Sequence, residues 1–70
     1  MNSYKYEPVI GADLKAKREA LGLTQTTVAR KASLSHPSYL SAIERGLQPG
    51  SKTLRRICKV LEIDPAKVTA

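Results

Sequence analysis

The side chains that could do chemistry in this sequence are few and widely spaced. The chain of 70 residues has one cysteine, Cys58, and one histidine, His36, so it lacks the set of Cys and His ligands that a metal site needs. No pair of carboxylates, Cys–His combination or phosphate-binding glycine loop is indicated either. These observations argue against an enzyme, and we expect no metal, cofactor or small-molecule ligand.

The charge of the chain favours a polyanionic partner. Twelve Lys and Arg residues against six Asp and Glu give a formal net charge of +6, which suits nucleic acid or, less well, an acidic membrane surface. No stretch approaches the roughly 18 apolar residues that a membrane helix needs. The first ten residues also lack the apolar centre of a secretory signal. We therefore expect a cytoplasmic protein without a membrane partner.

One segment departs from this basic character. Residues Ser33–Gly46 carry only two charges, Glu44 and Arg45, and are rich in hydroxyl groups. Small uncharged side chains allow a helix to lie deep in a DNA groove, while cations elsewhere attract the phosphates. The alternative is that these Ser and Ala residues only fill a solvated helix face.

The elements that would position this segment are short helices. Apolar residues recur at helical spacing along most of the chain, and the clearest amphipathic pattern is Leu54, Ile57, Cys58 and Leu61. Thr24 is a good N-cap, and Gly22 can adopt the left-handed conformation that ends a helix. The predicted helices are about Gly11–Leu21, Gln25–Ala32, Pro37 to a stop at Gly46, a fourth capped by Ser51, and a short fifth after Asp64 to about Val68.

These elements predict a single small domain. Residues 1–9 are expected to form an N-terminal arm and residues 10–70 an all-α, compact bundle of five short helices. The second and third helices can pack at a steep angle, with the small Ala29 at their close approach. The apolar anchors would be Val28, Ala32, Leu34, Leu40 and Ile43.

The opposite face of the third helix would then be free to enter a DNA major groove, whose width admits one helix. That face carries Ser38, Ser41, Ala42 and Arg45, preceded by His36 and Pro37. In the first helix, Arg18 falls on the apolar stripe between Leu14 and Leu21, where a cation needs a partner.

The stretch LGLTQTTVARKASLSHPSYLSAIERG, with PGSKTLRRICKVLEID after it, resembles the helix-turn-helix of the Cro and phage-repressor family, also called the Xre-type family. The resemblance covers about Ile10 to Val68 and implies a lambda-repressor-like DNA-binding domain. It implies a sequence-specific transcriptional regulator, a repressor that binds a palindromic operator in double-stranded DNA as a homodimer. Antitoxins and restriction–modification controllers use the same domain, and some members bind proteins instead, so these functions stay open.

The resemblance also implies roles for individual residues. The implied base contacts are His36, Pro37, Ser38, Ser41 and Ala42. The implied contacts with the DNA backbone are Gln25, Tyr39, Arg45, Ser51, Lys52 and Thr53. Glu44 is the implied partner of Arg18 in a structural ion pair. The segment SHPSY has one residue more than the commonest family pattern, which leaves open which of His36, Pro37 and Ser38 reaches a base.

Two further groups of basic residues have two interpretations each. Arg30 and Lys31, and likewise Arg55, Arg56 and Lys59, either contact phosphates or form solvated faces. Cys58 is interpreted as a small core residue. Tyr4, Lys5 and Tyr6 lie in the predicted arm, which either contacts DNA or is a disordered tail. Leu47, Val60 and Val68 are the candidates for a dimer contact.

Overall fold

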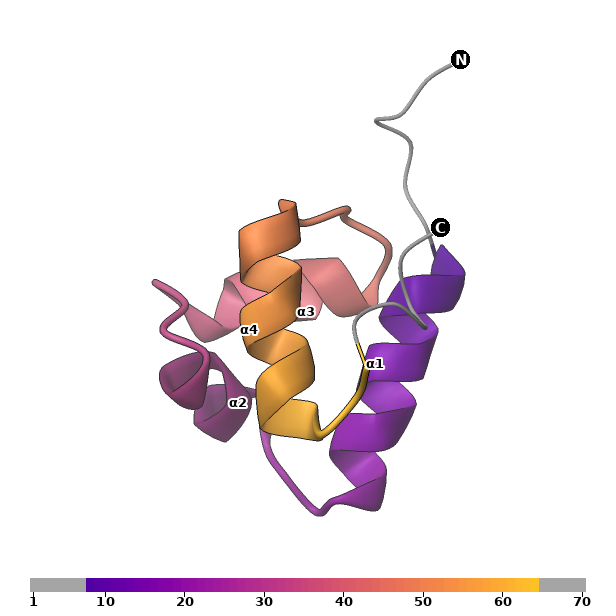
Figure 1. The fold of residues 1–70 in the computed structure, drawn as a ribbon, viewed down its shortest axis with the longest axis vertical. Coiled ribbons are helices and arrows are strands. Elements are labelled where there is room, and N and C mark those ends of the chain that lie inside the picture. Colours follow the sequence, from indigo (N-terminus) through magenta and orange to yellow (C-terminus); the bar gives the residue numbers. More distant parts are fainter. Residues whose placement is uncertain (1–7, 65–70) are drawn as a thin grey trace.

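The computed structural model describes the backbone of residues 8–64 and the side chains of residues 11–64. This part of the chain contains four helices and no strand, which confirms the all-α class (Figure 1). The fifth helix predicted after Asp64 lies outside the described residues, so the described fold has four helices rather than five. The helices are α1 (Pro8–Ala20), α2 (Gln25–Lys31), α3 (Pro37–Glu44) and α4 (Ser51–Leu61).

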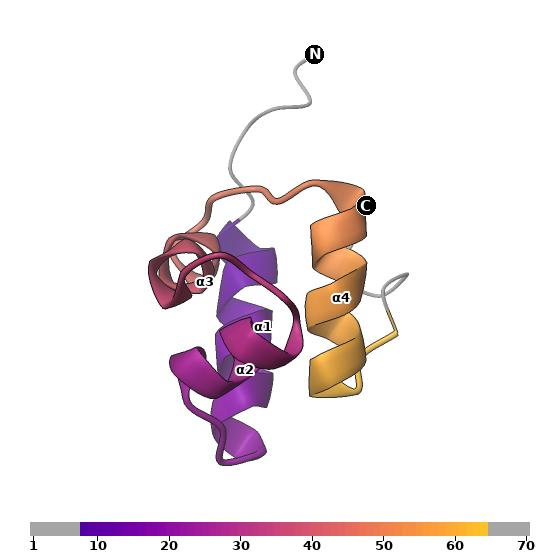
Figure 2. The ribbon, with the colours of Figure 1, turned by 90° about the vertical axis from the view of Figure 1, so that its left-hand side faces the viewer.

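The four helices enclose one apolar core. Both α3 and α4 pack against α1 and α2, and Figure 2 shows α3 and α4 on opposite sides with α1 and α2 between them. Every helix contributes to the core, and Leu23, Leu34, Tyr39, Val60 and Ile63 pack around it. The core residues are Leu14, Val28, Ala32, Leu40, Ile43, Leu54, Ile57, Cys58 and Leu61.

Helix α1 differs from its predicted bounds at both ends. It begins at Pro8, inside the predicted arm and before the predicted start at Gly11, because proline is well suited to the first turn of a helix. It ends at Ala20, where the Leu23 N–H donates to the Arg18 carbonyl at 3.0 Å. Leu21 therefore lies beyond the helix and is 37% exposed, so its assignment to the apolar stripe was wrong.

The connection between α2 and α3 is longer than usual. Thr24 caps α2, as predicted, by accepting a hydrogen bond from the Thr27 N–H at 3.1 Å. Five residues, Ala32–His36, then separate α2 from α3, whereas a helix-turn-helix has about three or four. Pro37 remains the first residue of α3. The extra residue is therefore accommodated in the turn.

Gly11 allows α1 to lie directly against the end of α3. A Cβ atom built on Gly11 would be 2.7 Å from the Glu44 carbonyl oxygen and 2.9 Å from its carbonyl carbon. Both atoms belong to the backbone and have no freedom to swing away. Only glycine permits this approach, which sets the distance between α1 and α3.

Helix α4 begins differently from the prediction but buries the predicted face. Gly50 is its N-cap, in an extended conformation, and its carbonyl accepts from the Leu54 N–H at 2.9 Å. Ser51 is the first helical residue, so the prediction that Ser51 caps the helix was wrong. Its inner residues Leu54, Ile57, Cys58 and Leu61 are at most 1% exposed.

The thiol of Cys58 belongs to this core. Burial raises the pKa of Cys58, and the negative charge of Asp64 acts in the same direction. The thiol is therefore held in its protonated, unreactive form. Within residues 8–64, no helix has the length and apolar character needed to cross a membrane.

Candidate nucleic-acid interface

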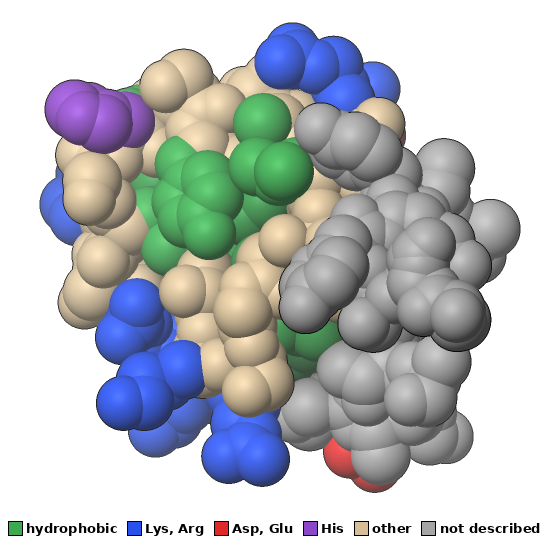
Figure 3. Space-filling view, turned by 90° about the horizontal axis from the view of Figure 1, so that it is seen from above, with side chains coloured by type: hydrophobic (Ala, Val, Ile, Leu, Met, Phe, Trp, Pro, Cys, Tyr) green, Lys and Arg blue, Asp and Glu red, His purple; other side chains and the backbone are tan. Residues whose placement is uncertain are grey.

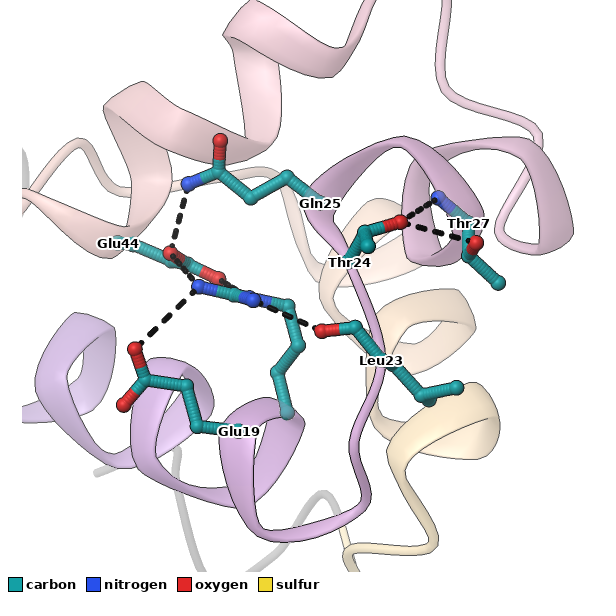
Figure 4. Close-up of polar contacts among 7 residues, drawn as sticks. Glu19, Leu23, Thr24, Gln25, Thr27 and Glu44 are labelled. Atoms are coloured by element: carbon teal, nitrogen blue, oxygen red, sulfur yellow. Dashed lines mark hydrogen bonds and ion pairs between the residues drawn. The ribbon is translucent and has the colours of Figure 1, made fainter.

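The end of α3 is held by one buried carboxylate. The Arg18 guanidinium donates to Glu44 through Nε at 2.7 Å and through Nη2 at 3.2 Å, in a two-pronged ion pair (Figure 4). Its remaining nitrogen, Nη1, donates to the Leu23 carbonyl at 2.8 Å. The two charged residues are 9% and 8% exposed. A pair with this geometry and burial gives α3 a defined position on α1.

Gln25 connects the same carboxylate to α2. Its Nε2 donates to Glu44 Oε1 at 2.9 Å, so Glu44 receives bonds from both α1 and α2 (Figure 4). Hydrogen bonding to Glu44 raises the pKa of Arg18, although burial opposes this effect. Glu19 lies at the edge of the cluster, 3.9 Å from Arg18 Nη2. The cluster therefore fixes the angle at which α3 is presented.

The outward side of α3 is polar and carries little charge. His36 is the N-cap residue, is exposed and makes no side-chain capping bond. Pro37 and Ser38 are also exposed, whereas Ser41 and Ala42 are half-buried. These five residues, to which the resemblance assigned base contacts, are brought together along the first two turns of α3.

Arg45 directly follows α3 and is oriented by it. Its Nη1 donates to Ser41 Oγ at 3.1 Å, and its side chain is exposed. The guanidinium therefore lies along the outward side of α3. Gly46, with a φ of +124°, reverses the chain at once, and the Leu47 N–H donates back to the Ala42 carbonyl at 3.0 Å.

The residues assigned to the DNA backbone lie around α3. Gln25 is half-buried at the start of α2, and Tyr39 is half-buried on α3, where it packs against the core. The first turn of α4 contains Ser51 and Lys52, both exposed, and Thr53, which is half-buried. The first backbone N–H groups of a helix have no partner within it and favour an anion.

One face of the molecule displays these chemical types together. Figure 3 shows the face of the molecule that lies at the top in Figure 1. On this face, an apolar patch lies among uncharged side chains and backbone. Lys and Arg side chains lie at its margins, and the single histidine of the chain lies at one corner (Figure 3). On the described part of this face, cations thus lie at the margins of a neutral centre (Figure 3).

Two residues of this region were missed by the sequence analysis. Gln48, in the loop between α3 and α4, has a buried Oε1 atom with no hydrogen-bond partner among the described residues. Its position between Gly46 and Pro49, just before the α4 N-terminus, was the available signal. Gly11 was missed because its neighbour Glu44 is distant in sequence.

The residues expected at a dimer contact or in the arm are only partly described. Leu47 and Val60 are half-buried, and Val60 packs against the core. Val68 lies outside the described residues, as do Tyr4, Lys5 and Tyr6.

The paired helices α2 and α3, supported by α1 and α4, define a helix-turn-helix protein. The model of the helix-turn-helix family of the Cro and phage-repressor type matches residues 14–68. The chain therefore belongs to this Xre-type family, which confirms the resemblance found in the sequence.

A solved structure agrees with this assignment. The chain is similar to the N-terminal DNA-binding domain of SinR from Bacillus subtilis, with a TM-score of 0.79 and 33% sequence identity. The similarity covers 89% of this chain and 91% of that domain. No curated protein sequence matches the chain.

Proposed function

We propose that this protein is a sequence-specific, double-stranded DNA-binding regulator of transcription that acts in the cytoplasm. The observation that carries the proposal is the outward side of α3, which is small and uncharged while Glu44 on its inner side is fixed to Arg18 and Gln25. Membership of the Xre-type family and the likeness to the SinR DNA-binding domain support it.

In this proposal α3 enters the major groove. Hydroxyls of Ser38 and Ser41 can donate to or accept from base edges, and the Ala42 methyl can contact a thymine methyl. His36 and Pro37 approach the groove from the first turn. Because Arg45 is directed by Ser41, it would reach the phosphates at the edge of the groove.

The flanking residues would hold the DNA backbone. Lys52 and the N–H groups at Ser51 and Thr53 present positive charge at the start of α4. Gln25, whose amide already braces Glu44, and the Tyr39 hydroxyl would contact phosphates next to α3. Such contacts set register and add affinity without selecting a sequence.

We further propose that the protein acts as a homodimeric repressor. Two copies of α3 related by a two-fold axis would occupy successive major grooves about 34 Å apart, which requires a palindromic operator. Occupation of such a site would block a promoter. Leu47 and Val68 are the proposed dimer contacts, together with the exposed part of Val60.

The experiment that tests this function is the selection of bound sites from random duplex DNA. We expect one enriched motif with two inverted half-sites whose centres are about one helical turn apart. Recovery of no motif would contradict sequence-specific binding. Recovery of one isolated half-site, with a monomer in sedimentation on that DNA, would contradict the dimer.

Salt dependence separates DNA binding from a protein-interaction role. The affinity for the selected duplex should fall linearly on logarithmic axes as salt rises, with a slope of about −0.9 for each phosphate contact. A protein contact made by the same helices would show no such slope. A flat response would therefore favour the protein-interaction alternative.

A further inference from the structure

Helix α4 carries most of the net charge of the protein. Its sequence SKTLRRICKVL contains four cations and no acidic residue, whereas the whole chain has a formal net charge of +6. All four side chains are exposed, and the only other exposed residue of α4 is Ser51. We call these four residues the α4 basic face: Lys52, Arg55, Arg56 and Lys59.

The α4 basic face forms one straight stripe. Its residues follow i, i+3, i+4 and i+7 spacing, which places them on one side of a helix over about 10.5 Å at 1.5 Å per residue. The buried residues Leu54, Ile57, Cys58 and Leu61 lie on the opposite side. Among the side chains of residues 11–64, none of the ion pairs found involves the stripe.

Beyond Lys52, the stripe does not share a side of the molecule with α3. Because α3 and α4 lie on opposite sides of α1 and α2 (Figure 2), their outward faces point in different directions. Lys52 lies in the first turn of α4, next to the loop from α3, and in the proposed function it contacts the duplex that α3 reads. Arg56 and Lys59 lie one and two turns further along and away from that end.

We propose that Arg55, Arg56 and Lys59 of the α4 basic face bind the phosphate backbone of a second DNA duplex, so that the protein bridges two DNA segments, while Lys52 contacts the first. This inference depends on the proposed DNA-binding function of α3. Duplex DNA presents a phosphate about every 3.4 Å along each strand, so the stretch from Arg55 to Lys59, about 6 Å long, can face about two of them. Protein interfaces instead depend on buried aromatic or aliphatic anchors, and the exposed residues of α4 include none.

Capture of a second duplex tests the bridge. The selected operator duplex is immobilised and saturated with protein, and a labelled duplex of unrelated sequence is then added. We expect capture by the unchanged protein and at least about a tenfold loss in the double variant Arg56→Gln/Lys59→Gln, because two phosphate contacts disappear. Operator affinity should stay within about twofold, since neither residue lies at the α3 face.

The matched control is Lys15→Gln/Lys17→Gln on α1, which removes the same charge from another surface. It should capture the second duplex as the unchanged protein does. Equal losses in both double variants would show a general charge effect and overturn the proposal. Unchanged capture by Arg56→Gln/Lys59→Gln would also overturn the proposal. The second duplex would then be held by the α3 of a protein copy that is not bound to the operator.

Further outcomes separate this inference from the proposed function. Operator binding without capture of a second duplex would overturn the bridge and leave the function of α3 intact. Weaker binding of the double variant to long operator duplexes, but not to short ones, would show that the stripe contacts the same duplex and would overturn the bridge. Stronger competition by polyglutamate than by duplex DNA at equal charge would assign the stripe to an acidic protein. Failure to select any operator would count against the proposed function itself.

Discussion

Helices α3 and α4 have similar buried faces but chemically different exposed faces. Each packs on α1 and α2 through residues that are almost fully buried. From Pro37 to Glu44, α3 has no cation, whereas α4 has four. Burial in a shared core requires the same apolar pattern of both helices, but it leaves their outward faces free. The exposed side chains therefore distinguish the two helices: those of α3 suit base edges, and those of α4 suit phosphates.

The inner faces differ in one respect. All the buried residues of α4 are apolar or a neutral thiol, whereas α3 also buries the charged Glu44. Apolar contacts are non-directional, but the ion pair with Arg18 and the bond from Gln25 have fixed geometry. The orientation of α3 is thus more narrowly specified than that of α4, which suits the role proposed for α3.

Removing the charge of Glu44 should have the largest effect. In Glu44→Gln the buried Arg18 loses its counter-charge, and we expect a loss of about 3 kcal/mol in the free energy of unfolding. Urea denaturation measures this change. The control is Glu62→Gln at the exposed end of α4, expected to change stability by less than about 0.5 kcal/mol. Equal stability of the two variants would show that the buried pair is unimportant.

Adding a charge to the outward side of α3 should have the next largest effect. Ala42→Glu places a carboxylate against DNA, so we expect at least a 100-fold loss of operator affinity, about 2.7 kcal/mol, with an unchanged melting temperature. Ala16→Glu adds the same charge on an exposed part of α1 and should weaken binding only slightly. Operator binding by Ala42→Glu as tight as that of Ala16→Glu would refute the placement of α3 in the groove.

Removing a single cation from the start of α4 should have the smallest effect. In Lys52→Ala we expect about a three- to tenfold weaker affinity for operator and unrelated DNA alike, with the salt slope reduced by about 0.9. Titration of both duplexes at several salt concentrations gives these values. A loss confined to one base position would mean that Lys52 reads sequence rather than phosphate.

Local patterns were enough to predict most of the helices and their inner faces. The apolar spacing in α4 predicted its buried residues, and Thr24 predicted the start of α2, because both signals act within a few residues. The start of α1 at Pro8 and the N-cap at Gly50 were missed. Several neighbouring residues can serve as the first or last residue of a helix. The spacing of apolar residues does not show which of them does so.

The amino-acid sequence by itself determined the all-α class, the Xre-type family and the contrast between an uncharged α3 and a basic α4. These properties follow from residue types and periodicity, which are local. Only the tertiary structure decided that Gln25 shares the Glu44 carboxylate with Arg18, that Gly11 lies against the end of α3, and that α3 and α4 lie on opposite sides of α1 and α2. Such relations join residues distant in the chain, and they are set by how the helices share one core.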